Sequence, residues 1–158
     1  MNKEMAFDSG IVQSLIERHK ARRSELLPVL HKIQSAFGYI PLGAVAMVAH
    51  KLNLSRAEVQ GAIHYYPHFW LQPTGKHVVR LCRAEACQSV GAEMLADHAM
   101  TQLGCDFNET TNDGSFTLEP VYCLGQCTCG PSMMIDDEVH ARVTPDKFNE
   151  LLYTKRAA

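Results

Sequence analysis

The chain has 158 residues, of which 46% are hydrophobic and 20% are charged. This composition is that of a globular protein with a real core, and the length suits one ordinary domain or two small ones. With 15 Lys and Arg against 17 Asp and Glu, the net charge is −2. This balance gives no electrostatic reason to expect binding to nucleic acid or to an anionic membrane surface.

The sequence shows neither a secretory signal nor a membrane-spanning segment. Its N-terminus lacks the basic and then apolar run of a signal peptide. The longest nearly uncharged apolar run, residues 40–49, is too short to cross a bilayer, which takes about 20 residues. We therefore expect a cytoplasmic protein without direct membrane insertion. In that reducing compartment, six cysteines indicate metal or redox chemistry rather than structural disulfides.

The first half of the chain has the periodicity of helices. A weak pattern predicts a helix over residues 11–22, and a stronger one predicts a helix over residues 24–37. Its apolar face would carry Leu26, Leu30, Ile33 and Phe37. Ser24 is the expected cap at its start and Gly38 the expected end, and Pro28 is expected to mark a kink in the first turn.

Two more helices are predicted before the sequence pattern changes to alternating strands and helices. Pro41 would open the first of them, with apolar residues along one side. Ser55 would open the second, because Glu58 stands where a capping box needs an acidic partner. The buried face of this helix is expected to carry Val59, Ile63 and Tyr66.

The second half alternates strands with helices. The predicted order is a strand over 77–82, a helix over 91–103, a strand over 116–122, a hairpin that turns at Asp136 and Asp137, and a last helix from Thr144–Pro145. Strand, helix, strand, hairpin and helix is the order of a thioredoxin-like α/β layer. The predicted fold is therefore α/β, with a helical N-terminal domain over 1–74 and a thioredoxin-like domain over 75–158.

The cysteines of the second half form two close pairs. Four residues separate Cys82 from Cys87, three separate Cys123 from Cys127, Cys129 follows two positions later, and Cys105 stands alone. A thioredoxin-type redox pair needs two intervening residues, so that chemistry is excluded. Four thiolates in two pairs also suit structural zinc, although an α/β layer with its own core has less need of it.

A [2Fe–2S] cluster explains the two pairs better, because it needs two thiolates on each of two irons. Small residues around the pairs would let backbone N–H groups approach the sulfurs. These residues are Ala84, Ala86, Gly91, Gly125 and Gly130. Arg80 and Arg83 would either add positive potential beside the cluster or lie at a solvated strand end. No phosphate-binding glycine loop is present in the sequence, so we expect no nucleotide or flavin site in this chain.

Four stretches of the sequence together resemble a known family. They are LLPVLHKIQSAFGYIP, LSRAEVQGAIHYYPHF, CRAEACQSVGA and YCLGQCTCGPSMMIDDEVHARV. They resemble the thioredoxin-like [2Fe–2S] ferredoxin subunit of NADH-linked complexes, such as the 24-kDa-type subunit of respiratory complex I, and the resemblance covers about residues 24–152. The short length and CLGQCTCGP are most similar to the gamma subunit of molybdenum-containing, NAD-dependent formate dehydrogenase.

The resemblance implies which residues hold the cluster. It implies iron ligation by Cys82, Cys87, Cys123 and Cys127, because the three-residue gap of the family ends at Cys127. Cys129 would be a spare thiol near the cluster, and Cys105 is most simply a small buried apolar side chain.

The resemblance also implies a role in one-electron transfer without substrate chemistry. The chain would lie beside a flavin- and NAD-binding iron–sulfur subunit and serve a large molybdenum-containing catalytic subunit, so that FMN, NAD and the molybdenum cofactor are expected only on these partners. The alternatives are the equivalent subunit of an NAD-linked hydrogenase or of complex I, a freestanding ferredoxin, and a zinc-stabilised interaction module.

Overall fold

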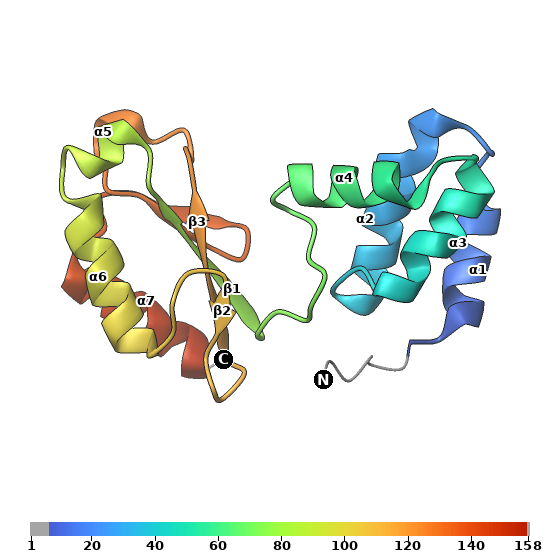
Figure 1. Cartoon of the computed structure of the whole chain (residues 1–158). Coiled ribbons are helices and arrows are strands. Elements are labelled where there is room, and N and C mark those ends of the chain that lie inside the picture. Colours follow the sequence, from blue (N-terminus) through green and yellow to red (C-terminus); the bar gives the residue numbers. More distant parts are fainter. Residues whose placement is uncertain (1–6, 158) are drawn as a thin grey trace. The chain divides into compact units, whose positions relative to one another are not determined.

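The computed structural model describes residues 7–157. They fall into two compact units, unit 1 up to Pro73 and unit 2 from Thr74 onward (Figure 1). Unit 1 is helical, and unit 2 combines a sheet with helices. The α/β fold class with a helical N-terminal part is therefore confirmed. Within residues 7–157, no helix is both long enough and apolar enough to cross a membrane.

Unit 1 is a bundle around one hydrophobic core. Its helices are α1 (Ser9–Glu17), α2 (Leu26–Phe37), α3 (Leu42–Leu52) and α4 (Arg56–Tyr65), with a short 3₁₀ turn, η1 (Arg23–Glu25), before α2. Fully buried residues from α1, α2, α3 and α4 meet in the core, among them Val12, Leu30, Ile33, Val48, Leu52 and Val59. Burial of such side chains contributes about 1.5–3 kcal/mol each, so this core holds the helices together.

Two predicted helix starts in unit 1 were wrong. The first helix begins at Ser9, because the Asp8 carboxylate accepts hydrogen bonds from the N–H groups of Gly10 and Ile11. Ser24 does not cap α2, because it lies inside the 3₁₀ turn and α2 begins only at Leu26. Pro28 therefore falls in the first turn of α2, where its missing N–H has no intrahelical partner to lose, and it needs no kink.

The other helix signals in unit 1 were mostly confirmed. Gly38 ends α2 in the left-handed conformation, at φ 78°. Ser55 and Glu58 form the predicted capping box at the start of α4. Pro41 is the residue before α3 rather than its first residue. Tyr66 was wrongly placed on a buried face, because it lies after α4 ends and is 39% exposed.

Unit 2 is built on a five-stranded mixed sheet in the order β2-β3-β1-β4-β5. The strands are β1 (His77–Cys82), β2 (Glu109–Thr110), β3 (Phe116–Val121), β4 (Met133–Ile135) and β5 (Glu138–His140). β1 and β3 are parallel neighbours, with His77 beside Phe116 and Cys82 beside Val121. The other pairs are antiparallel. The carboxyl ends of the two central strands therefore lie at the same edge.

The helices of unit 2 are α5 (Glu85–Gln88), α6 (Ala92–Leu103) and α7 (Pro145–Ala157). α6 and α7 contact each other and share a core with the sheet, to which Val79, Leu81, Phe116, Leu118, Phe148 and Leu152 belong (Figure 1). The predicted strands, hairpin and last helix are confirmed. α5 and β2 were missed, because elements of two to four residues carry too little periodicity to stand out in a sequence.

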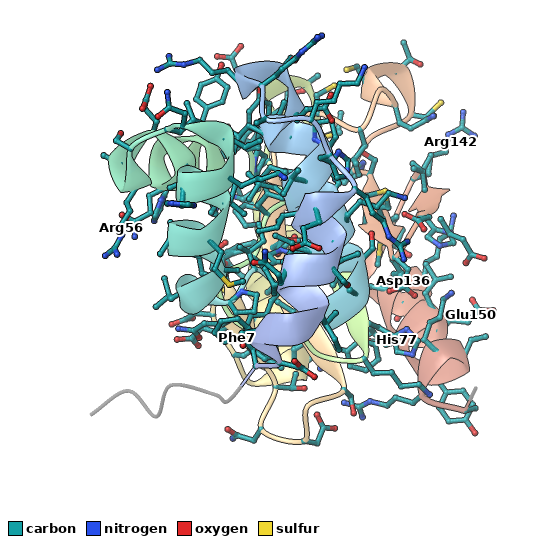
Figure 2. All side chains as sticks on the ribbon, turned by 90° about the vertical axis from the view of Figure 1, so that its right-hand side faces the viewer. Phe7, Arg56, His77, Asp136, Arg142 and Glu150 are labelled. Atoms are coloured by element: carbon teal, nitrogen blue, oxygen red, sulfur yellow. The ribbon has the colours of Figure 1, made fainter. Side chains whose placement is uncertain are left out.

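Asp136 fixes the β4–β5 turn to the start of β1. Its carboxylate accepts hydrogen bonds from Nδ1 of His77 at 2.9 Å and from the N–H of Val78 at 3.1 Å, and Nζ of Lys155 lies 3.7 Å away (Figure 2). Burial alone would raise the pKa of Asp136, but the hydrogen bonds from His77 and Val78 outweigh it. The pKa of this carboxyl therefore lies below its usual 3.8.

We predict that Asp136→Asn lowers the free energy of unfolding of unit 2 by about 1 kcal/mol near neutral pH, because charge-assisted hydrogen bonds are lost at a partly screened site. A carboxyl with a depressed folded pKa stabilises above its unfolded pKa, and this contribution disappears as pH falls through the folded value. The deficit should therefore shrink below about pH 4. Urea unfolding between pH 3 and 6 measures it.

Asp137→Asn is the control for this prediction, because the neighbouring Asp137 makes none of the side-chain hydrogen bonds or ion pairs found among residues 7–157. It should unfold like the wild type across the whole range. A deficit in Asp136→Asn that stayed constant down to pH 3 would show that the charge of Asp136 contributes nothing.

Candidate iron–sulfur site

Cysteine residues stand at the carboxyl ends of both central strands of unit 2. Cys82 is the last residue of β1, and its register partner Val121 is the last residue of β3. Cys123 follows two positions after Val121. Because parallel strands end at the same edge, two thiol-bearing loops that are far apart in sequence begin next to each other.

The first pair, Cys82 and Cys87, lies in the interior. Cys82 is 3% exposed and Cys87 is 2% exposed, and both pack with Ala92 in a small apolar cluster. The short helix α5 places Cys87, and its Sγ lies 3.5 Å from Oγ of Ser132, the residue before β4. Two buried thiols with a hydroxyl beside them form one half of a ligand set for soft metal ions.

The two buried thiols differ in acidity. Burial raises the pKa of the Cys82 thiol, and the neighbouring Cys87 raises it further. Burial acts on Cys87 in the same direction, but hydrogen bonds from Ser132 and Cys82 outweigh it, so the pKa of Cys87 lies below its usual value. Cys87 is therefore the sulfur of this pair that loses its proton more readily.

The second pair, Cys123 and Cys127, is exposed to solvent. The two sulfurs lie 3.6 Å apart, and the N–H of Gly125 donates to Sγ of Cys123 at 3.3 Å. The hydrogen bond to Cys123, followed by the charge of that residue, raises the pKa of the Cys127 thiol. Cys123 has a φ of 144°, a backbone conformation that side-chain-bearing residues rarely adopt and that is found mainly at functional sites.

The loops that carry the two pairs contact each other. The short helix α5 contacts the 3₁₀ turn η2 (Cys127–Cys129), and the charges of Cys87 and Cys82 both act on the Cys127 thiol. Gly130 explains how the loops approach each other. A Cβ added there would meet Sγ of Cys87 at 3.3 Å and Cγ2 of Val90 at 2.8 Å, so a larger residue would force these side chains to shift.

The remaining two cysteines lie outside these pairs. Sγ of Cys129 lies 3.9 Å from Nη2 of Arg142 and 3.8 Å from Oγ1 of Thr128. Cys105 is partly buried against the core of unit 2. Burial raises the pKa of its thiol, and Glu109 and Asp106 raise it further. Cys105 is therefore part of the core of unit 2 and of neither pair, and ligation of a cluster by Cys82, Cys87, Cys123 and Cys127 stays a prediction.

Arg80 and Arg83, which the sequence suggested as cations beside the cluster, each contact a carboxylate. Arg80 is only 8% exposed and donates to the carboxylate of Glu119 at 3.0 Å, so it is not a solvated strand end. The Arg83 guanidinium lies 5.1 Å from the centre of the Phe107 ring and 3.7 Å from the carboxylate of Glu93. The cation that contacts the cysteine loops is Arg142, which the sequence did not reveal because it lies beyond β5, 13 positions after Cys129.

The chemistry of these donors fits a two-iron cluster. The thiols come as two pairs at one edge of the sheet, and each iron of a [2Fe–2S] cluster takes two thiolates. The N–H of Gly125, the hydroxyl of Ser132 and the glycine at 130 supply the hydrogen bonds and close backbone approach that such a cluster needs.

Comparison with known proteins also supports a [2Fe–2S] cluster. The profile of the family described as thioredoxin-like [2Fe-2S] ferredoxin matches residues 12–156. One relative, a subunit of the NADH-quinone oxidoreductase of Pseudomonas aeruginosa, is 33% identical over 141 residues, covering 89% of this chain and 85% of that protein. The HndA subunit of the NADP-reducing hydrogenase of Solidesulfovibrio fructosivorans is also 33% identical over 141 residues, covering 89% of this chain and 82% of its own length.

A solved structure shares the fold. The NAD+-reducing [NiFe]-hydrogenase in its H2-reduced state superposes with a TM-score of 0.71 at 18% identity. The match covers 87% of this chain but only 23% of the hydrogenase chain. The likeness therefore concerns the fold of one part of a larger polypeptide.

Proposed function

This chain belongs to the thioredoxin-like [2Fe–2S] ferredoxin family. We propose that it is the electron-transfer subunit of a soluble, cytoplasmic, NAD-dependent formate dehydrogenase. The observation that carries the electron-transfer role is the presence of two cysteine pairs on the loops that follow the parallel strands β1 and β3, with the sulfurs of the second pair 3.6 Å apart. A bound [2Fe–2S] cluster would supply the ability to accept and release one electron at a time.

The two cysteine pairs would bind the cluster from opposite sides. Cys82 and Cys87 would hold it from the buried side, where Ser132 hydrogen-bonds to Cys87. Cys123 and Cys127 would hold it from the exposed side, where the Gly125 N–H stabilises negative charge on sulfur. One side of the site is thereby shielded from water, and the other is open to a partner subunit.

The assignment to formate dehydrogenase depends on the resemblance of CLGQCTCGP to the gamma subunit of that enzyme. In that role the chain would carry out no substrate chemistry. A flavin- and NAD-binding iron–sulfur subunit and a large molybdenum-containing subunit would be its partners, and FMN, NAD and the molybdenum cofactor would lie on them.

A second candidate is the equivalent subunit of an NAD-linked hydrogenase or of an NADH–quinone oxidoreductase. It is favoured by two relatives that are 33% identical over most of this chain, one named as a subunit of an NADH-quinone oxidoreductase and the other as a subunit of an NADP-reducing hydrogenase. A freestanding ferredoxin and a zinc-stabilised module are further alternatives, of which the second would contain zinc and no acid-labile sulfide.

The test is to recover the native assembly. The chain would be tagged in its own host, purified anaerobically, and assayed for NAD reduction with formate. We expect formate-dependent activity to co-purify with a complex that contains flavin and molybdenum. An assembly that is inert to formate but reduces NAD with hydrogen, or oxidises NADH with quinone, would refute the formate assignment and support the second candidate.

A further inference from the structure

Arg142 lies against the loop that carries the second cysteine pair. Its Nη2 is 3.9 Å from Sγ of Cys129, and Cys129 ends the 3₁₀ turn that begins at Cys127. Figure 2 shows Arg142 well away from His77 and Asp136, which mark the other end of β1. A full positive charge is thus held beside Cys129, two positions after the exposed thiol of Cys127.

The position of Arg142 is fixed by the backbone as well as by its side chain. Its own N–H donates to the carbonyl oxygen of Cys129 at 2.8 Å, and the N–H of Val143 donates to that of Pro131 at 2.9 Å. Nζ of Lys147 donates to the carbonyl oxygen of Ala141 at 2.8 Å. Arg142 also has a left-handed backbone, at φ 50°, which these bonds hold in place. The backbone that carries this exposed cation is therefore held against the loop.

The charge of Arg142 is also less compensated than that of the other arginines near the site. Arg80 and Arg83 have the carboxylates of Glu119 and Glu93 as partners. None of the ion pairs found among residues 7–157 includes Arg142. Its field at the second pair is therefore reduced by solvent and salt but not by a neighbouring anion.

We propose that Arg142 is a positioning residue that raises the reduction potential of the cluster by holding a positive charge against the second ligand loop. Reduction adds one negative charge to the site, and a nearby cation stabilises that charge more than it stabilises the oxidised state. The inference rests on the proposed function, because it requires a [2Fe–2S] cluster on these thiols.

The experiment is a potentiometric titration of the full chain followed by electron paramagnetic resonance, after assay of iron and acid-labile sulfide. Two neutral variants, Arg142→Gln and Arg142→Met, are compared with Arg142→Lys, which keeps the charge. Arg156→Gln is the matched control, since Arg156 lies 5.5 Å from the centre of the Phe116 ring, at the opposite end of the sheet from Cys82.

We expect both neutral variants to keep the cluster and to be reduced at more negative potentials. The equilibrium constant for reduction should fall roughly three- to tenfold, and tenfold corresponds to about 59 mV for one electron. Arg142→Lys should retain most of the wild-type potential, and Arg156→Gln should retain all of it.

Each other outcome has a distinct meaning. Wild-type chain without iron and sulfide would overturn the proposed function itself. Loaded neutral variants with an unchanged potential, or an equal shift in Arg156→Gln, would overturn only the inference about Arg142. Loss of the cluster from both neutral variants would also overturn it, because Arg142 would then be needed for binding the cluster rather than for setting its potential.

Discussion

Cys87→Ser is expected to abolish binding of the cluster. Cys87 is 2% exposed and lies on α5 against Gly130, so no solvent-derived ligand has room to replace its sulfur. A serine hydroxyl is a poor substitute, since iron in such clusters prefers the softer thiolate. We expect iron and acid-labile sulfide to fall at least tenfold, together with the visible absorption of the cluster.

Cys105→Ser is the matched control, because it makes the same change at a partly buried cysteine outside both pairs. It should keep the full iron and sulfide content of the wild type. A Cys87→Ser protein with normal iron and sulfide would contradict the ligand assignment, and so would a colourless Cys105→Ser protein. Zinc in the wild type without sulfide would favour the interaction module instead.

Gly130→Val is expected to have the next largest effect. The backbone of Gly130 has a φ of −68°, which any residue adopts, so the consequence is purely steric. The new Cβ alone would lie 2.8 Å from Cγ2 of Val90 and 3.3 Å from Sγ of Cys87. Overpacking of this kind costs about 1–3 kcal/mol, and here the displaced atom is a proposed ligand. We expect the cluster content to fall by at least half and unit 2 to unfold at lower urea concentration.

Gly61→Val tests whether this effect is specific to the site. A Cβ at Gly61 would meet nothing within 4 Å, and in the middle of α4 valine is no worse a helix residue than glycine. This variant should therefore match the wild type in iron content and stability. A Gly130→Val protein that kept its full cluster would show that α5 and the second loop separate more easily than their contact suggests.

Local signals explain which parts of the fold were predictable from the sequence. The capping box at Ser55, the left-handed glycine at 38 and the strand at 77–82 are each recorded in a few neighbouring residues. The close approach at Gly130 was also predictable, because small residues beside a thiol favour backbone contact. The pairing of the cysteines followed from their spacing, since each pair spans one loop.

Long-range contacts explain what the sequence did not show. Arg142 meets Cys129 only because the segment after β5 hydrogen-bonds to the loop before β4. Ser132 meets Cys87 because β4 lies beside β1. Neither contact is predicted by a periodic pattern or by a local motif of the sequence. Asp8 was overlooked as a helix cap for a different reason, since the apolar pattern of α1 is too short to define its start.

The relative placement of the two cysteine loops is set by the parallel pairing of β1 and β3. It does not depend on how many residues connect the two loops. The turn through Gly114 joins β2 to β3 next to the start of β1, and the cysteine loops leave the opposite ends of the strands. A Cβ added at Gly114 would meet nothing within 4 Å, while its carbonyl oxygen accepts a hydrogen bond from the N–H of Lys76. Residues added at this turn would lengthen the connection between Cys87 and Cys123 without changing which residues of the strands are neighbours. The turn is therefore a natural place to insert a spectroscopic label or an affinity tag, because the four proposed ligands would keep their positions.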